Sequence, residues 1–242
     1  MQPLFNFQGS APFGYLAFLG TAALVFLGGI ALIIFLLTER YTLAKRLAQL
    51  GLASGAFYLL VLFCFSAFSS DQAVAAGGEK YFCEVDCHQA ISVVGVERAK
   101  LVGLPPAEVP AQGEFYIVKL RVRFDEHTIS ARRPKDAPLH PSPKHAVAVD
   151  ADGTVYRPSV EAELALAGKG ALPSLTLPIR PGDAYETSLV FDLPANVREP
   201  RLLITETDPV TSFLIGHENS FFHKKTTFQL PPATASQSAK SE

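Results

Sequence analysis

Two long stretches of the chain carry no charged side chain, and they limit what the N-terminal part can fold into. Residues 1–38 contain no Asp, Glu, Lys or Arg, and residues 11–37 are almost wholly apolar. A second uncharged stretch covers residues 47–70. A helix needs about 20 apolar residues to cross the hydrocarbon core of a bilayer. The sequence therefore predicts a transmembrane hairpin over 1–70, with helices at about 13–37 and 47–68.

The connection between the two stretches predicts their orientation. Residues 38–46 hold Arg40, Lys45 and Arg46, whereas no Lys or Arg precedes the first stretch. Because cytoplasmic loops are enriched in basic residues, we expect this loop in the cytoplasm and both chain termini outside it. A cleaved signal peptide is the competing interpretation, but it would need a basic start and an apolar core of about 7–15 residues. We therefore expect a multi-pass membrane protein.

The two predicted helices have the composition of an anchor. Neither uncharged stretch offers a group that could relay protons or coordinate ions, which argues against a channel or a transporter. Gly51 and Gly55 have the small-xxx-small spacing that lets helices approach closely. We expect this pair to pack the hairpin against itself, with a contact between two copies as the alternative. The lipid bilayer is the expected partner of this part.

After Ser70 the pattern changes to that of short strands. In residues 115–124, apolar side chains alternate with Lys119, Arg121 and Arg123, as in a half-buried antiparallel strand. Residues 146–149 and 154–156 flank a turn sequence and predict a β-hairpin. Further strands are predicted at 90–96, 175–179, 185–193, 201–205 and 226–230. Together they predict a two-sheet antiparallel sandwich over 88–230.

Three segments outside the predicted strands have compositions that favour other structures. Residues 160–169 favour a short helix, residues 126–144 a long loop, and residues 231–242 a disordered tail. The net charge of −2 gives no electrostatic attraction to nucleic acid, so a nucleic-acid partner is not expected.

Four short motifs in this order resemble a known family. They are GEFYIVKLRVRF at 113–124, DGTVY at 152–156, RPGD at 180–183 and LVFDLP at 189–194. The region 88–205 resembles the small immunoglobulin-like, or telokin-like, domains of unknown function on bacterial cell-surface and membrane-anchored proteins. The resemblance implies an all-β immunoglobulin-like sandwich outside the inner (cytoplasmic) membrane of a bacterium. It supplies no catalytic residues.

One motif has the residue types for chemistry. Cys83, Cys87 and His88 lie at the end of a predicted connector, 71–87. Because the space outside a bacterial membrane is oxidising, we expect a disulfide between Cys83 and Cys87 and no cofactor. The alternatives are copper or zinc held by both thiolates and His88, covalent haem, or free thiols. The haem motif Cys-x-x-Cys-His is one residue shorter than this spacing.

A polar segment near the C-terminus is a second candidate site. His217, Glu218, Asn219 and His223 lie between apolar residues, which is typical of a recognition loop or of a capped turn before the last strand. No nucleophile elbow, P-loop or dinucleotide fingerprint occurs, so an enzyme is not expected.

The function predicted from these features is that of a non-enzymatic, membrane-anchored extracytoplasmic module that binds a protein or an envelope component. The alternative is a metal- or haem-binding redox accessory of a membrane respiratory or assembly system, using Cys83, Cys87 and His88.

Overall fold

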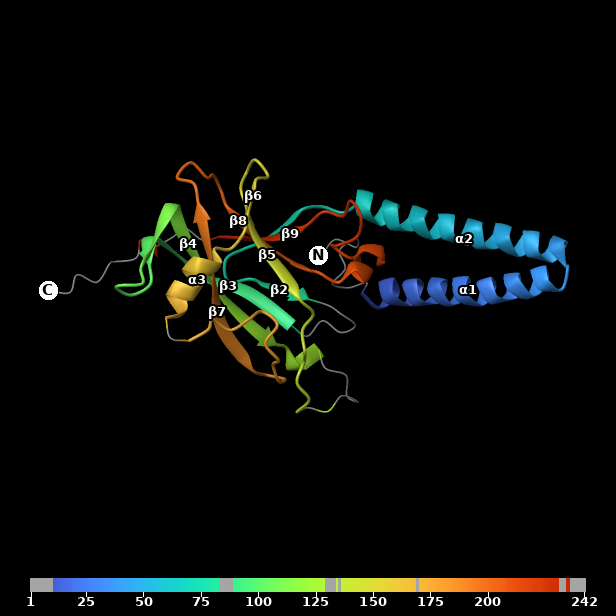
Figure 1. Cartoon of the computed structure of the whole chain (residues 1–242), viewed down its shortest axis with the longest axis horizontal. Coiled ribbons are helices and arrows are strands. Elements are labelled where there is room, and N and C mark those ends of the chain that lie inside the picture. Colours follow the sequence, from blue (N-terminus) through green and yellow to red (C-terminus); the bar gives the residue numbers. More distant parts are fainter. Residues whose placement is uncertain are drawn as a thin grey trace. The chain divides into compact units, whose positions relative to one another are not determined.

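The chain folds into two compact units. The computed structural model describes residues 11–82, 89–128, 134, 136–168, 170–230 and 234–235 (Figure 1). The helical unit contains the N-terminal residues up to Ser70 together with 208–225, and the β unit contains 71–207 and the residues from Thr226 onward. The segment 208–225 therefore belongs with the helices, although the sequence pattern had assigned it to the sandwich. The β unit also begins at Asp71, which differs from the predicted start at 88.

Two long apolar helices form most of the helical unit, as predicted. Helix α1 covers Ala11–Leu37 and helix α2 covers Tyr41–Ala67. Thr38 ends α1, since its hydroxyl donates a 2.8 Å hydrogen bond to the carbonyl of Ile34, and Glu39 then takes a positive φ of 58°. The turn is shorter than the predicted loop 38–46, and Lys45 and Arg46 lie within α2. Charge marks the end of an apolar run but does not stop a helix, because Lys and Arg are good helix formers.

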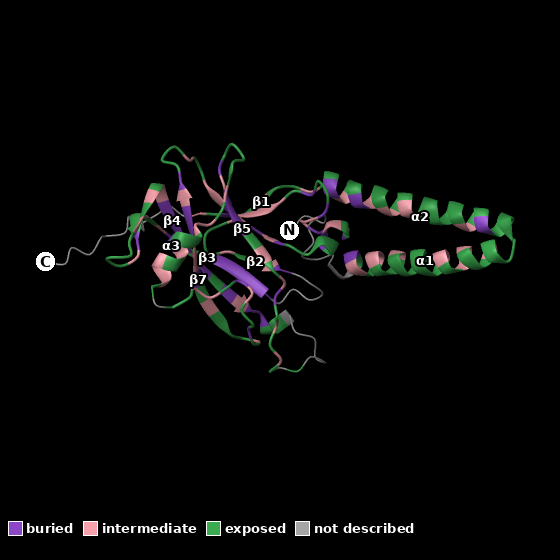
Figure 2. Cartoon of the chain, viewed as in Figure 1, coloured by how far each residue is buried: buried purple, intermediate pink, exposed green. Residues whose placement is uncertain are grey.

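The side chains of this hairpin face outward. Figure 2 shows α1 and α2 as largely exposed, in contrast to the buried strands of the β unit. Leu24 and Phe26 are each 68% exposed, and Leu52 is 78% exposed. Both helices are long and apolar enough to cross a membrane, by length and composition.

The predicted glycine pair does not sit in a close contact between the helices. A Cβ atom placed on Gly51 or Gly55 would meet no atom within 4 Å. Gly51 instead lines an apolar groove of about 540 Å³ between α1 and α2, together with Gly28 and Gly29. The hairpin thus leaves these backbones accessible, and the predicted alternative of a contact between two copies stays a prediction.

The β unit is a sandwich of two sheets. One sheet has the order β1 (Gln72–Val74), β9 (Thr226–Gln229), β8 (Arg201–Glu206), β5 (Lys144–Val149) and β6 (Val155–Tyr156). The other has the order β10 (Thr234–Ala235), β3 (Gln89–Val102), β4 (Val109–Phe124) and β7 (Ala184–Leu193), with β2 (Glu79–Phe82) also paired to β3. Most pairs are antiparallel, as predicted, but β1–β9 and β10–β3 are parallel.

The core lies between the two sheets. The alternation predicted in β4 is confirmed, because its inward-facing side chains are all buried. They are Tyr116, Val118, Leu120, Val122 and Phe124. At the start of β4 the opposite face is buried as well, since Phe115 and Ile117 pack with Ala162 in a second cluster.

Helix α3 (Val160–Ala167) covers that second face and confirms the short helix predicted for this region. Ser159 caps its N-terminus, where the hydroxyl accepts a 3.3 Å hydrogen bond from the amide of Ala162. The 3₁₀ helices Glu126–Thr128 and Pro209–Phe213 complete the described helical elements.

The strand predicted at 175–179 is wrong. Residues 175–176 form a turn, and Ile179 makes only an isolated bridge to Leu139. Pro173 and Pro178 lack the amide protons that a ladder needs, so Leu175 and Ile179 are buried without forming a strand. Of the segments 126–144 and 231–242, residues 129–133, 135, 231–233 and 236–242 lie outside the described residues.

Candidate interaction surfaces

The segment 208–225 connects β8 to β9 and is built from consecutive tight turns. Asp208 starts it by accepting a 2.9 Å hydrogen bond from the amide of Val210, with Pro209 at the first helical position. Four further amide-to-carbonyl hydrogen bonds then recur every three residues. They run from Leu214 to Thr211, from His217 to Leu214, from Ser220 to His217 and from His223 to Ser220.

Polar side chains fill the inside of this segment. Thr211, His217, Ser220 and His223 are all buried. The Nδ1 atom of His217 accepts a 3.0 Å hydrogen bond from the amide of Asn219, and the Ser220 hydroxyl donates to the carbonyl of Leu214. These side chains therefore hold the turns together.

All four residues predicted for a recognition loop thus take part in hydrogen bonds of the turn structure. Asn219 donates from its side-chain amide to Thr211 at 3.1 Å, and Nδ1 of His223 lies 2.7 Å from the carbonyl of Lys224. The carbonyl of Glu218, the fourth residue, accepts a hydrogen bond from the ammonium of Lys225. This arrangement fits the capped-turn alternative, and recognition by these residues stays a prediction.

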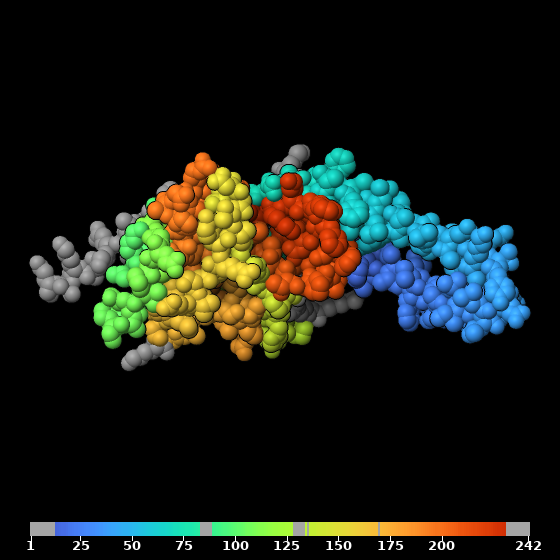
Figure 3. All heavy atoms as spheres, turned by 45° about the horizontal axis from the view of Figure 1, so that its top comes forward, coloured from blue at the N-terminus to red at the C-terminus, as the bar shows by residue number. Residues whose placement is uncertain are grey.

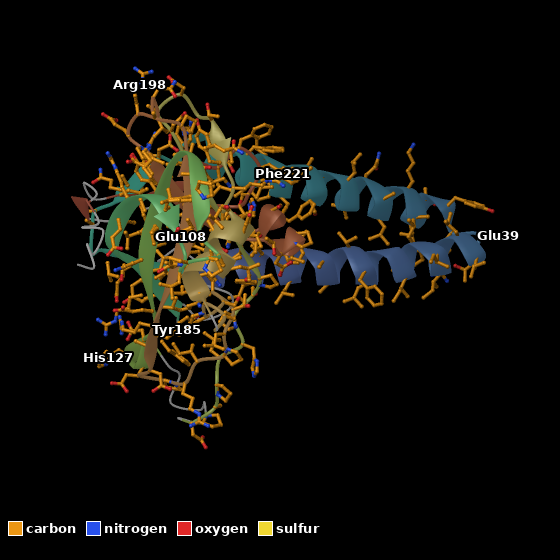
Figure 4. All side chains as sticks on the ribbon, turned by 60° about the vertical axis from the view of Figure 1, so that its left-hand side comes forward. Glu39, Glu108, His127, Tyr185, Arg198 and Phe221 are labelled. Carbon is orange, nitrogen blue, oxygen red and sulfur yellow. The ribbon has the colours of Figure 1, made fainter. Side chains whose placement is uncertain are left out.

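The same segment contacts helix α2 and the residues that directly follow it. The Tyr58 hydroxyl donates a 2.6 Å hydrogen bond to the carbonyl of Phe213, and the Lys224 amide donates a 2.9 Å hydrogen bond to the hydroxyl of Ser69. The rings of Phe63 and Phe222 lie 6.0 Å apart. Figure 3 shows the segment as a compact red group against the teal end of α2. In Figure 4, Glu39 marks the turn end of the hairpin and Phe221 lies at the opposite end.

The β unit carries a polar cluster on the outer face of its second sheet. The strand register creates it, because Tyr81 on β2 and Arg123 on β4 are both paired with Ala90 on β3. The guanidinium of Arg123 donates two hydrogen bonds to Glu79, of 2.9 and 2.7 Å, and the Tyr81 hydroxyl donates to Asp125 at 2.8 Å. Glu79 lies two residues before Tyr81, and Asp125 lies two residues after Arg123. Because side chains two residues apart along a strand point to the same face, all four side chains lie on one face of the sheet.

The cluster shifts the ionisation of its members. The hydrogen bond from Arg123 lowers the pKa of Glu79. Burial acts to raise the pKa of Asp125, but hydrogen bonds from Tyr81, the His127 amide and Arg123 together outweigh it, so the pKa is lowered. Burial and the hydrogen bond to Asp125 raise the pKa of Tyr81 to about 12. Both carboxylates are therefore ionised at neutral pH and held by one guanidinium.

We expect Arg123→Gln to lower the free energy of unfolding by about 1 kcal/mol at pH 7, because two partly exposed ion pairs are lost. Glu79 and Asp125 have lowered pKa values, so their contribution is present above about pH 4.5 and is lost as pH falls through the folded-state pKa values. The difference between variant and wild type should therefore shrink below pH 4. Denaturation of the detergent-solubilised chain at several pH values measures this. Arg121→Gln, two residues earlier on the same strand face, is the control, and an equal loss there would contradict the prediction.

A pocket of about 420 Å³ lies beside β7 in the β unit. Its walls come from β5, β7, α3 and the segment 172–176, and its polar residues include Lys144, His145, Glu163 and Ser188. The Tyr185 and Thr187 hydroxyls on β7 donate to the carbonyls of Ser174 and Pro173 at 2.7 and 2.6 Å, which fixes one wall. Tyr185 is labelled in Figure 4.

Glu163 lies where α3 covers the edge of β7. Its carboxylate accepts a 3.3 Å hydrogen bond from the Val190 amide, and the carbonyl of Val190 accepts a 2.7 Å hydrogen bond from the Ser159 amide. Burial raises the pKa of Glu163, although the Val190 amide acts in the opposite direction. A half-buried carboxyl group with a raised pKa in a pocket is a candidate ligand contact. With a cationic and an imidazole side chain nearby, the pocket suits a small polar group or a peptide segment.

We expect Glu163→Gln to raise the free energy of unfolding at pH 7 by about 0.5 kcal/mol, since the amide oxygen can still accept from Val190 without the cost of burying a charge. The pKa of Glu163 is higher in the folded state than in the unfolded state. The carboxyl group therefore stabilises the fold when pH is below the unfolded-state pKa, and this stability is lost as pH rises through the folded-state pKa. The advantage of the Gln variant should therefore be absent at pH 4 and present at pH 7. Glu163→Leu, which removes the acceptor, should be destabilising. A Gln variant less stable than wild type at pH 7 would contradict the assignment.

The cysteine motif lies outside the described residues, so the predictions for Cys83, Cys87 and His88 remain untested. Within the described ranges, no group of three or more His, Cys, Asp or Glu side chains is arranged to hold a metal ion. Cys64 on α2 is a free, exposed thiol.

Comparisons with known proteins give fold neighbours only. No protein-family model and no curated protein matches the chain. A secreted protein from Mycobacterium tuberculosis is 14% identical, with 68% of this chain and 99% of that chain covered and a TM-score of 0.41. A conserved hypothetical protein from Bacillus anthracis is 16% identical, with coverages of 54% and 93% and a TM-score of 0.37. An uncharacterized β-sandwich protein from Clostridium difficile is 12% identical, with coverages of 67% and 96% and a TM-score of 0.37.

Proposed function

We propose that this protein is a membrane-anchored extracytoplasmic binding module without enzymatic activity. The observation that carries the proposal is the exposed apolar surface along both long helices, which water would not tolerate on a monomeric soluble protein. In a bilayer the same side chains contact acyl chains, and the helices satisfy their own backbone hydrogen bonds. The hairpin is thus the anchor and the sandwich is the part that it displays.

The orientation follows from the basic residues at the turn of the hairpin. Arg40, Lys45 and Arg46 gather at that end, and the positive-inside rule assigns it to the cytoplasm. The sandwich follows the other end of α2 in the chain, so it lies outside the cytoplasm. The resemblance to telokin-like domains of bacterial membrane-anchored proteins supports the same location.

Binding is assigned to the pocket beside β7, which combines Glu163, Lys144 and His145 with apolar walls. Pockets with a few convergent polar groups are the usual ligand sites of small domains. A protein or an envelope component that presents a polar extended segment fits this chemistry.

A topology reporter tests the anchor. Alkaline phosphatase, which is active only outside the cytoplasm, should be active when fused after Ser70 and inactive when fused within the turn at Glu39. Both fusions should stay in the membrane pellet after alkaline extraction. Release of the chain from the pellet, or activity of the Glu39 fusion, would overturn the proposed anchoring and orientation respectively.

Site-specific photo-crosslinking tests the pocket. A photoreactive amino acid at His145, which is exposed and lines the pocket, should give a discrete crosslinked product in intact cells. The matched control is Val155 on β6, which is 57% exposed and does not line the pocket. The product should also be weakened by Glu163→Leu. Identical crosslinking patterns at both positions would exclude the pocket as the binding site.

A further inference from the structure

The segment 208–225 combines buried polar side chains with exposed phenylalanines. Its buried side chains include Thr211, His217, Ser220 and His223, whereas its phenylalanines are exposed. Phe222 is 83% exposed, and Phe213 and Phe221 are each 44% exposed. A buried polar group or an exposed large apolar patch is the informative departure from ordinary burial, and here both occur in one short segment.

We infer that this segment is a lipid-binding element that inserts its phenylalanines into the interfacial region of the outer leaflet. The inference rests on the proposed function, because it requires the hairpin to span the membrane. It adds a second membrane contact, made by a loop between two strands of the sandwich that lies far along the chain from the spanning helices.

Contacts within the helical unit favour lipid over a protein partner. The ring of Phe222 lies 6.0 Å from that of Phe63, which is 41% exposed on α2. The Tyr58 hydroxyl bonds to the carbonyl of Phe213 from the same helix. The exposed rings are therefore continuous with a helix surface that the bilayer covers. Aromatic side chains concentrate where spanning helices meet the headgroups, because one side of that region is apolar and the other is wet.

Lys224, near the end of the segment, lies where a basic side chain could reach the lipid headgroups. The amide of Lys224 bonds to Ser69, just beyond the last residue of α2, and the Lys224 side chain is exposed. A lysine at the end of a spanning helix can extend its ammonium group toward lipid phosphates while its stem contacts apolar surface. The hydrogen-bonded turns hold the phenylalanines in place before they meet the bilayer, as in preformed interfacial anchors.

The absence of tryptophan from the chain makes a direct test available. We would reconstitute three full-length variants in phosphatidylcholine vesicles, each with one tryptophan. Phe222→Trp reports on the segment, Phe26→Trp on the middle of α1, and Val155→Trp on an exposed site of the β unit. Val210→Trp is a second reporter on the segment should Phe222→Trp not fold. The tryptophan fluorescence of each variant is measured with two kinds of quencher. Iodide quenches from the water phase, and lipids brominated either near the headgroup or deep in the acyl chain quench from the bilayer.

The inference expects bromine near the headgroup to quench Phe222→Trp most strongly and iodide to quench it weakly. Phe26→Trp should be quenched by deep bromine, and Val155→Trp by iodide alone. Iodide quenching of Phe222→Trp, with Phe26→Trp still quenched by lipid, would overturn the lipid-binding element and leave the anchor intact. Shielding of Phe222→Trp from both quenchers would indicate a protein contact and would also overturn it. If lipid does not quench Phe26→Trp, the proposed anchoring itself fails.

Discussion

Replacing Gly113 by alanine is expected to lower the free energy of unfolding of the β unit by about 3 kcal/mol, at the upper end of the usual cost of overpacking. A Cβ atom at this position would lie 2.1 Å from the carbonyl oxygen of Leu193, 2.8 Å from its carbonyl carbon and 3.0 Å from the Cα of Pro194. All three atoms belong to the backbone, so no side-chain rotation can relieve the clash. The two strands must therefore separate where β4 meets the end of β7.

That separation would break further interactions. Asp192 accepts hydrogen bonds from the amides of Gln112 and Gly113, at 2.7 and 2.9 Å, and these hold β4 against β7 at its entry into the sheet. A carboxylate bonded to two amides contributes more than a neutral pair, so its displacement adds to the steric cost. Thermal denaturation of the detergent-solubilised chain, followed by circular dichroism, would measure the loss.

Gly95→Ala is the matched control, because it is also a glycine within a strand of the same sheet. It lies at a bulge in β3, where an added Cβ would meet no atom within 4 Å. We expect no destabilisation there, since the added Cβ meets no atom and alanine only reduces the conformational freedom of the unfolded chain, which is a stabilising effect of less than about 1 kcal/mol. Equal destabilisation by both substitutions would show that the close approach at Gly113 is not the cause.

The fold could be predicted where one physical rule decided the outcome. The uncharged stretches 11–37 and 47–70 predict helices, and the alternation in 115–124 predicts a strand; each signal has a single dominant cause, and both predictions are confirmed. The start of α2 was missed because Lys45 and Arg46 end the apolar run without ending the helix. The prediction of a strand at 175–179 was wrong because the apolar residues were given more weight than Pro178.

The candidate surfaces depended on contacts between distant residues, which the sequence does not display. Glu163 had no local signal, because its role comes from the amide of Val190 on another element. For 208–225, the polar residues were singled out, whereas the exposure of the phenylalanines was not predicted. Their spacing could not show that His217 and His223 turn inward and leave Phe222 outside.

The second large effect is expected at Lys80, which links the two sheets of the sandwich. This residue belongs to β2, next to β3, yet its ammonium group donates to the carbonyls of Ile204 on β8 and Thr226 on β9, at 2.8 and 3.1 Å. Its side chain is 3% exposed, and the ring of Phe82 lies 4.9 Å from the charge. Hydrogen bonds from a buried charged group are stronger than neutral ones, and the ring adds a cation–π interaction.

We expect Lys80→Ala to lower the free energy of unfolding by about 3 kcal/mol, through loss of these hydrogen bonds and of the packing of the four-carbon stem. Lys80→Met retains most of the stem and removes only the charged donor, so it should recover part of the loss. Hydrogen exchange of the full chain in detergent should show faster exchange in β8 and β9 as well as in β2, because the lysine ties strands from both sheets. Faster exchange confined to β2 would mean that the sheets are held together without this link, and the lysine would then be a local packing residue.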